Sequence, residues 1–252
     1  MARIDRRAPD EPRKVKIQPG YLDFAEGSAL IEVGRTRVVC SASLEDRVPP
    51  FLKGGGVGWV TAEYAMLPRS TVTRTPRDVG SGRPSGRVFE IQRMIGRSLR
   101  AVVDMEVLGE RTITIDCDVI QADGGTRTAS ITGAYVALYQ AFLTMVRRGI
   151  IPTIPLEAAL AAISVGIVDS RFLLDLCYEE DVRADADFNV VMTDTGQMVE
   201  IQGTAESKPF SKETLDQVLA LAQVGLEGLF EAQREAIESL EGLPAMARYS
   251  RS

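Results

Sequence analysis

The sequence predicts one α/β domain in which helices pack on mixed β-sheets, and three observations lead to this prediction. The chain has 252 residues, of which 45% are hydrophobic and 25% are charged, as in typical globular proteins. Its first part alternates apolar and polar positions between turn residues, and its later part twice repeats strands followed by a long helix. No low-complexity linker divides it. We therefore expect residues 1–252 to form a single domain, with flexible ends at 1–10 and 244–252.

The predicted strands alternate apolar and polar residues, and they begin or end near glycine, proline or acidic turns. They cover residues 14–18, 29–33, 36–43, 59–66, 112–120, 161–168, 172–178, 188–193 and 198–203. Apolar residues at three- and four-residue spacing predict helices over 87–107, 128–148 and 212–240. Residues 67–83 have no periodicity and are rich in Pro, Gly, Ser, Thr and Arg, which predicts a long exposed loop.

The chain has no histidine, which removes the usual general base near neutral pH and the Ser-His and Cys-His nucleophilic schemes. Chemistry would rest on carboxylates, arginines, a metal ion or backbone dipoles, as in phosphoryl or nucleotidyl transfer. Three cysteines without a Cys-x-x-Cys pair predict buried thiols in a reducing compartment. The N-terminus does not resemble a secretory signal, and the apolar stretch 158–168 is too short to span a bilayer. We expect a cytoplasmic protein without a membrane segment.

A glycine turn between a predicted strand and a predicted helix is a candidate phosphate site. It reads Asp123-Gly124-Gly125-Thr126-Arg127-Thr128. Such a turn directs backbone N–H groups and the positive end of the helix dipole at one point, while Arg127 adds a bidentate cation. The alternative is an ordinary helix N-cap.

A pair of aspartates, Asp181 and Asp187, lies in an acidic segment between two strand-like runs. Folding of this segment can bring both carboxylates to one rim, and Asp185 could join them. Carboxylates, together with waters and substrate phosphate oxygens, are the usual ligands of Mg²⁺. The alternative is a solvated acidic turn.

Eight arginines and only two acidic residues lie between positions 69 and 100, in a chain with a net charge of −6. A local cluster of one sign on an acidic protein predicts contact with an RNA or DNA backbone. The alternative is a solvated loop followed by one polar helix face. The arginines are Arg69, Arg74, Arg77, Arg83, Arg87, Arg93, Arg97 and Arg100.

Several segments closely resemble the ribonuclease PH family. They are residues 66–69, 85–87, 90–97, 116–134 and most of 173–193, and the similarity extends from about Arg3 to about Leu240. The resemblance implies a ribonuclease PH fold with a pseudo-two-fold β-α arrangement and a homohexamer built as a trimer of dimers. It also implies a phosphorolytic 3′-to-5′ exoribonuclease that trims tRNA precursors, and other RNA 3′ ends, by passing the terminal nucleotide to inorganic phosphate and releasing nucleoside diphosphates.

Carried over residue by residue, the resemblance implies three groups of site residues. The attacking phosphate would be held by Arg87, Gly125, Thr126 and Arg127. Asp181 and Asp187 would have the catalytic role, in Mg²⁺ binding or proton transfer. RNA would be guided by Arg69, Arg74 and Arg77, and we expect Arg93 and Arg97 to continue that track.

The chain departs from the family's pattern at two motifs. The usual Arg-x-Asp-Gly-Arg reads Arg3-Ile4-Asp5-Arg6-Arg7, and Tyr-Gly-Met-Leu-Pro-Arg reads Tyr64-Ala65-Met66-Leu67-Pro68-Arg69. Residues 79–84 are also unusual. Two other interpretations stay open: a subunit of an exosome-type ring that works beside an inactive chain, and a catalytically silent RNA-binding member of such a ring.

Overall fold

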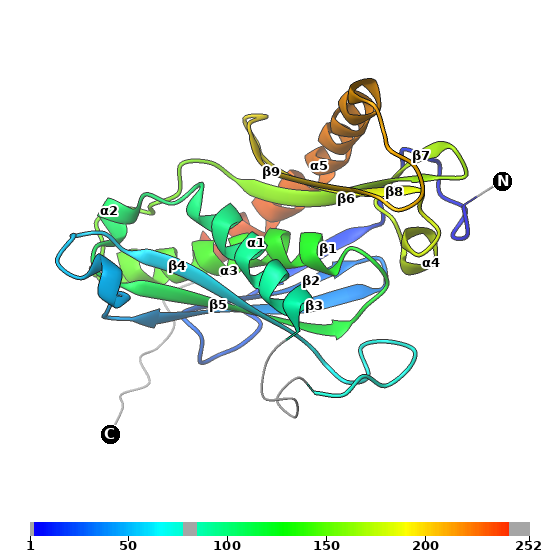
Figure 1. Ribbon diagram of the computed structural model, residues 1–252. Helices are drawn as coiled ribbons and strands as arrows, with labels where there is room; N and C mark the ends of the chain where they lie inside the picture. Colours follow the sequence, from blue (N-terminus) through cyan, green and yellow to red (C-terminus); the bar gives the residue numbers. More distant parts are fainter. Residues whose placement is uncertain (1–2, 78–84, 242–252) are drawn as a thin grey trace.

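Two β-sheets are stacked with helices between them, and a long helix covers the far face of the second sheet (Figure 1). The computed structural model describes residues 3–77 and 85–241. Five strands form the first sheet and four form the second. The sheet-then-helix order occurs in both halves of the chain. The predicted α/β fold with mixed sheets and packed helices is confirmed.

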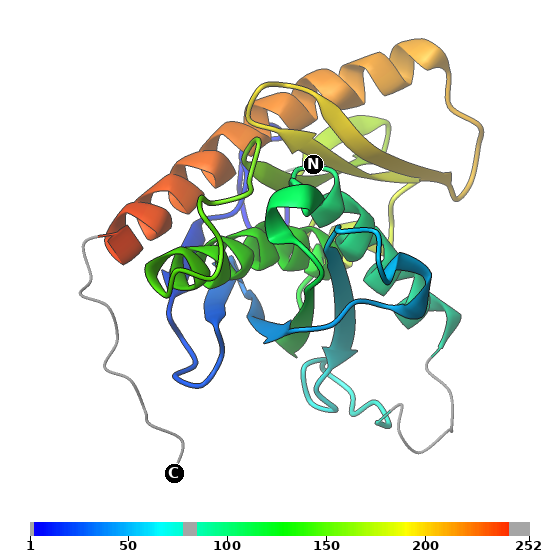
Figure 2. The same cartoon turned by 90° about the vertical axis from the view of Figure 1, so that its left-hand side faces the viewer.

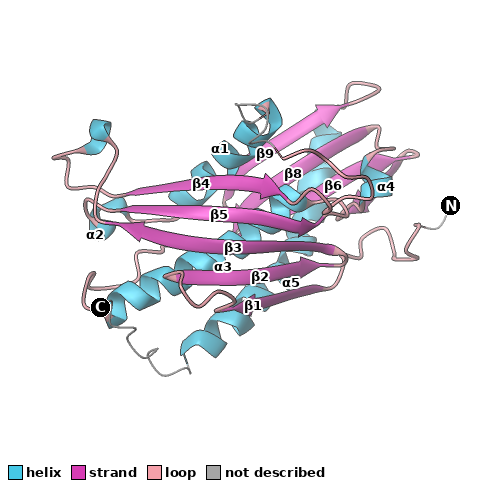
Figure 3. Cartoon of the chain, turned by 90° about the horizontal axis from the view of Figure 1, so that it is seen from below, coloured by secondary structure: helices cyan, strands magenta, loops and turns pink. Residues whose placement is uncertain are grey.

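The first sheet is seen face-on in Figure 3, with helices behind it. It consists of β1 (Val15–Pro19), β2 (Gly27–Val33), β3 (Thr36–Glu45), β4 (Trp59–Met66) and β5 (Thr112–Gln121), in the order β1-β2-β3-β5-β4. All neighbours are antiparallel except β4 and β5. Parallel neighbours need a crossover connection. It is supplied by α1 (Gly86–Arg100) and the short α2 (Met105–Leu108), while a 3₁₀ turn (Pro50–Leu52) precedes β4.

Helix α3 (Thr126–Arg147) lies at the centre of the molecule, between the two sheets. It has no charged residue from Thr128 to Val146, a longer uncharged run than the stretch 158–168 considered above. Among the described residues it is the one helix long and apolar enough to cross a membrane, but 72% of its most apolar window is buried inside the fold. Its apolar character is that of a core helix packed on both sides.

The second sheet positions the acidic segment. It contains β6 (Leu160–Val168), β7 (Arg171–Leu174), β8 (Ala186–Thr193) and β9 (Met198–Ala205), in the order β7-β6-β8-β9, and α5 (Lys212–Glu241) crosses its outer face (Figure 2). Because side chains alternate along a strand, Phe188 and Val190 of β8 pack toward α5. Val191 packs with the core around α3. Asp187 lies four residues before Val191 on the same strand, so its side chain is on the same face, the α3 side of β8.

The helix predicted over 87–107 is wrong at its C-terminal end, because α1 ends at Arg100 and a separate helix starts at Met105. Val103 instead forms a β-bridge with Leu156. The Asp104 side chain accepts hydrogen bonds from the N–H groups of Glu106 and Val107 in α2. The β-branched residues Val102 and Val103 disfavour continuation of α1. Asp104 is a good N-cap, and α2 begins after it.

The strand predicted over 172–178 is also wrong at its end. It stops at Leu174, because Asp175 has a φ of 54°, and a short helix, α4 (Tyr178–Asp181), follows. Asp181 therefore lies on a helix rather than in a loop between strands. All other predicted boundaries lie within two residues of the observed ones. The three cysteines are free and buried, as predicted.

Residues 67–77 are irregular, as the loop prediction requires. Arg83 and the unusual residues 79–84 lie outside the described residues, and so does the C-terminal stretch 244–252.

Candidate active site

The glycine turn forms the N-terminus of α3. Gly124 and Gly125 have φ values of 76° and 63°, in the left-handed region that glycine adopts without strain. A Cβ atom on Gly124 would lie 2.6 Å from the carbonyl oxygen of Leu176. The glycine thus lets the turn approach the segment that leads into α4. The first N–H groups of α3 have no helical partner and point out of this turn as potential anion donors.

The two threonines of the turn have different surroundings. The hydroxyl of Tyr64 donates to Oγ1 of Thr126 at 2.8 Å, so the proton of Thr126 remains available to a ligand. Burial raises the pKa of Tyr64, against the opposing effects of Thr126, Arg87 and Arg127, which keeps this donor protonated at neutral pH. Thr128 is buried and donates to the Gly125 carbonyl at 2.9 Å.

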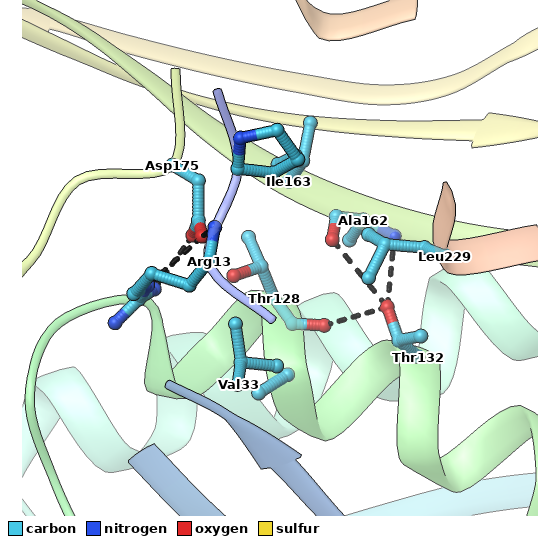
Figure 4. Close-up of a pocket in the computed structure, with 10 residues that line it drawn as sticks. Arg13, Val33, Thr128, Thr132, Ala162, Ile163, Asp175 and Leu229 are labelled. Carbon is cyan, nitrogen blue, oxygen red and sulfur yellow. Dashed lines mark hydrogen bonds and ion pairs between the residues drawn. The ribbon is translucent and has the colours of Figure 1, made fainter. Parts of the chain in front are cut away.

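Behind the turn, Thr128 lines a cavity of about 10 Å³, together with Arg13 and Asp175 (Figure 4). A cavity of this size is at the lower limit for one water molecule and is too small for phosphate. The candidate anion site is therefore the open side of the α3 N-terminus. Thr128 does not face it but stabilises the turn through its bond to Gly125.

The two predicted aspartates come together beside this turn. Asp181 is the last residue of α4 and Asp187 is the second residue of β8. Burial raises the pKa of Asp187, and the charges of Asp181 and Glu206 raise it further, against the charge of Arg127. Desolvation also raises the pKa of Asp181, and it outweighs the charges of Arg87, Arg127 and Arg13. The described residues offer neither carboxylate a side-chain hydrogen-bond donor.

Asp185 does not join this pair. Its carboxylate accepts a hydrogen bond from the Ser207 hydroxyl at 3.0 Å, and it is not among the main charges acting on either aspartate. Glu206, which sequence reasoning missed, does act on both. Within residues 3–77 and 85–241, no group of three or more His, Cys, Asp or Glu side chains is arranged to hold a metal ion.

Two arginines flank the aspartates. Arg87 is exposed in the first turn of α1, and its charge acts on both Asp181 and Tyr64. Arg127 is 21% exposed and donates from Nη1 to Glu90 at 3.3 Å and to Gln202 at 2.9 Å. The structure thus brings together the α3 N-terminus, two cations and two carboxylates.

The arginines predicted to guide RNA do not form one free track. Arg69, Arg74 and Arg77 are exposed on the loop after β4, and Arg93 is exposed on α1. Arg97 instead forms an ion pair with Glu200 of β9 at 2.6 Å. Arg100 stacks 4.2 Å above the Trp59 ring and donates to the Val60 carbonyl. The loop itself is attached to the site, because the N–H of Ala122 donates to the Ser70 carbonyl at 2.8 Å.

A buried ion-pair network supports the site from below, and sequence reasoning missed it. Arg13 donates to both carboxylate oxygens of Asp175 at 2.9 and 2.6 Å (Figure 4). It also donates to the carbonyl of Asp123 at 2.6 Å. Arg3 binds Glu180 in the same bidentate way, at 2.9 and 2.8 Å. Glu180 in turn accepts from the N–H of Cys177 at the start of α4. In the sequence, the one indication of this network was the group of arginines near the N-terminus.

Arg13 thus joins the glycine turn to Asp175, in the segment that leads into α4. Burial alone would raise the pKa of the Asp175 carboxyl, but the hydrogen bonds and charge of Arg13 lower it. The same holds for Glu180, where the hydrogen bonds of Arg3 outweigh burial. Both carboxylates are therefore ionised at neutral pH.

Comparisons with known proteins agree with this geometry. Two models of the 3′ exoribonuclease family match, domain 1 over residues 11–143 and domain 2 over residues 158–225. A protein from Dehalococcoides mccartyi named ribonuclease PH is 60% identical over 234 residues, which cover 93% of this chain and 97% of the relative. A second ribonuclease PH, from Moorella thermoacetica, is 57% identical over 237 residues, covering 94% and 95%.

Solved structures share the fold at lower identity. The Archaeoglobus fulgidus exosome with RNA bound to the active site superposes with a TM-score of 0.78 at 24% identity, covering 91% of this chain and 92% of the other. An archaeal exosome core gives a TM-score of 0.71 at 22% identity, covering 95% and 91%.

Proposed function

The chain belongs to the 3′ exoribonuclease family and is a phosphorolytic 3′ exoribonuclease of the ribonuclease PH type; from this premise we propose that the α3 N-terminus and the Asp181–Asp187 pair form its active site. The observation that carries this assignment is electrostatic. Donors and cations suited to an inorganic phosphate lie directly beside two carboxylates whose pKa values are raised by desolvation and by neighbouring negative charges.

Phosphate is the nucleophile in this proposal. The N–H groups at the start of α3, the Thr126 hydroxyl and the guanidinium groups of Arg87 and Arg127 would bind it. One phosphate oxygen attacks the phosphorus of the last phosphodiester, the bond to the departing 3′ oxygen breaks, and a nucleoside diphosphate leaves. Catalysis consists mainly of alignment and charge neutralisation, as in other phosphoryl transfers.

Asp181 and Asp187 suit a divalent cation such as Mg²⁺. Two partly desolvated carboxylates, to which the described residues offer no side-chain hydrogen-bond donor, fit an ion that takes one or two protein carboxylates and completes its shell with water and phosphate oxygens. When bound, the ion neutralises charge on the scissile group. The raised pKa of both carboxyls also favours delivery of a proton to the departing 3′ oxygen by one of them.

The substrate we propose is a tRNA precursor with extra 3′ nucleotides. Arg69, Arg74, Arg77 and Arg93 are exposed and would contact its backbone. Arg97 would do so only after releasing Glu200.

We further propose a homohexamer, a trimer of dimers, in the cytoplasm. Support for assembly comes from exposed apolar side chains of the kind that oligomers bury, such as Phe24 at 93% and Phe51 at 70% exposure. Three free cysteines support a reducing compartment. Light scattering coupled to size-exclusion chromatography tests the assembly, and a monomer would refute it.

The function is tested by incubating the protein with a tRNA that carries extra 3′ nucleotides, with Mg²⁺ and with or without inorganic phosphate. We expect nucleoside diphosphates that appear only with phosphate. Nucleoside monophosphates would mean that water is the nucleophile and that the anion site is wrongly assigned. RNA binding without products would favour the silent ring member.

A further inference from the structure

The Arg127 guanidinium is held by two side chains from other elements. Gln202 of β9 accepts a hydrogen bond from Nη1 at 2.9 Å, and Glu90 of α1 accepts from the same nitrogen at 3.3 Å. Gln202 also donates to Glu90 at 2.9 Å, which closes a triangle of three side chains. Each corner of the triangle is therefore fixed by the other two.

Strand geometry explains how Gln202 reaches α3. It pairs with Asn189 of β8, and the next residue, Gly203, faces Phe188 on the α5 side of the sheet. Since neighbours on a strand point to opposite faces, Gln202 is directed to the side of α1 and α3. Glu200 shares this face and receives the second N–H of the Gln202 amide at 3.2 Å.

Both N–H groups and the oxygen of the Gln202 amide take part in these contacts. Its oxygen accepts from Arg127, and its nitrogen donates to Glu90 and to Glu200, which is itself paired with Arg97. Its orientation is consequently determined, because a flipped amide would place its NH₂ group against the guanidinium and its oxygen against two carboxylates. A carboxylate at this position would be repelled by both glutamates, so a neutral amide is required.

Only one edge of the guanidinium is used in this way. In the part of the chain that the structure describes, the hydrogen bonds of Arg127 all leave from Nη1. The edge formed by Nε and Nη2 keeps the parallel N–H pair that binds a phosphate in bidentate fashion. A long side chain fixed before the ligand arrives loses less conformational entropy on binding.

We propose that Gln202, together with Glu90, is a positioning residue for phosphorolysis that presents the free edge of Arg127 to the attacking phosphate. The inference rests on the proposed role of Arg127. It assigns Gln202 an effect on the use of phosphate and none on the binding of RNA.

The experiment measures KM for phosphate, KM for RNA and kcat in Gln202→Met, which has a side chain of similar length without hydrogen-bonding groups. We expect KM for phosphate to rise about tenfold, the size of effect common for outer-shell partners of a binding group. KM for RNA should stay unchanged, and kcat at saturating phosphate should change less than about twofold. Gln202→Asn, which is too short to reach Arg127, should act in the same direction and replaces the first variant if that fails to fold.

Arg127→Met and the double variant separate this inference from the proposed function. If Arg127 binds phosphate, Arg127→Met raises KM for phosphate, and adding Gln202→Met then has little further effect. Arg37→Gln is the matched control, because it breaks an exposed arginine–glutamate pair at 2.7 Å on the first sheet and should leave all constants unchanged.

Three outcomes overturn the proposals in different ways. An unchanged KM for phosphate in Arg127→Met refutes the assigned phosphate site. A raised KM in Arg127→Met but not in either Gln202 variant refutes the positioning role alone. A Gln202 variant that raises both KM values, or that adds fully to Arg127→Met, shows a structural effect and likewise refutes the positioning role.

Discussion

Asp181 and Asp187 each carry a charge that their surroundings disfavour. Burial raises both pKa values, and the two carboxylates repel each other, as shown by the effect of Asp181 on Asp187. The described residues offer these charges no side-chain hydrogen bond, and the backbone N–H of Asp187 does not offset the effect of burial on the pKa of its carboxyl. Carboxylate charges that destabilise the free protein are expected at a site where a bound ligand offsets them.

Replacement of Asp187 by Asn should therefore separate activity from stability. We expect kcat to fall by about 100-fold or more, as for other groups that act on transition-state charge, with RNA binding largely kept. The folded-state pKa of Asp187 is raised, so ionisation weakens the native state as pH increases from the unfolded pKa through the folded pKa. The Asn variant should have a higher Tm than the parent near pH 7 and lose that advantage at acid pH. Asp185→Asn, which changes an exposed carboxylate two residues away, is the control, and near-normal phosphorolysis in Asp187→Asn would exclude the proposed role.

Arg6 is a second informative residue, because it occupies a place where the family pattern has glycine. Its φ is 65°, and its N–H donates to the Arg3 carbonyl at 3.0 Å in a tight turn. Arginine adopts this left-handed conformation with strain, which glycine lacks.

We expect Arg6→Gly to keep or slightly raise stability, because relief of strain offsets the greater freedom of glycine in the unfolded chain. Arg6→Val should lower stability by about 1 kcal/mol or more, since a β-branched residue tolerates positive φ poorly. Urea unfolding of both variants tests this, and equal stabilities would show that the turn relaxes.

At the scale of elements, the strands and long helices could be predicted because local patterns determine them. β4 was predicted over its observed residues, and α5 within one residue of its end. The errors occur where distant contacts decide the backbone. α1 ends shortly before Val103, which forms a β-bridge with Leu156, and β7 ends just before Asp175, whose side chain binds Arg13. The local pattern of apolar and polar residues cannot reveal such distant partners.

The same distinction applies to the candidate site. The glycine turn, Arg127 and the two aspartates could be identified because each lies in a short motif with a recognisable composition. Gln202, Glu206 and Arg13 could not, because their importance depends on which strand or loop lies beside them. Gln202 and Arg127 are 75 residues apart in the sequence.

The turn before α3 gives a prediction with a built-in comparison. Gly124 and Gly149 have similar φ values of 76° and 67°, but a Cβ on Gly124 would meet the Leu176 carbonyl oxygen at 2.6 Å, whereas one on Gly149 would meet nothing within 4 Å. Gly149→Ala should cost about 1 kcal/mol for the backbone strain alone. Gly124→Ala should cost about 2 kcal/mol or more beyond that because the clash is with backbone, and it should also raise KM for phosphate. Equal losses in urea unfolding would show that the close approach is not required.

At the scale of the whole molecule, the N-terminal segment connects the two sheets. Arg3 binds Glu180 and Arg13 binds Asp175, and both of these acidic residues follow β7 of the second sheet. Arg13 also binds the turn after β5 of the first sheet. Breaking one member of a buried pair leaves a charge without compensation, which typically costs about 3–5 kcal/mol.

Asp175→Asn tests the contribution of this network to stability. The folded-state pKa of Asp175 is lowered, so its contribution is complete above the unfolded pKa of about 4 and is lost as pH falls toward the folded value. The variant should lose about 3 kcal/mol at pH 7. Its stability should then depend less on pH below about 4 than that of the parent. Parallel unfolding curves at pH 7 and in acid measure both effects, and an unchanged acid dependence would contradict the assignment.

The contact between Arg3 and Glu180 joins residues 177 positions apart, and this has a consequence for synthesis of the protein. The residues of α4 must be synthesised before Glu180 can bind Arg3, and those of β8 and β9 before Asp187 and Gln202 can join the site beside Arg127. A nascent chain therefore has the phosphate turn long before it has a working site. A chain that ends before β8 has neither Asp187 nor Gln202, so its site is incomplete.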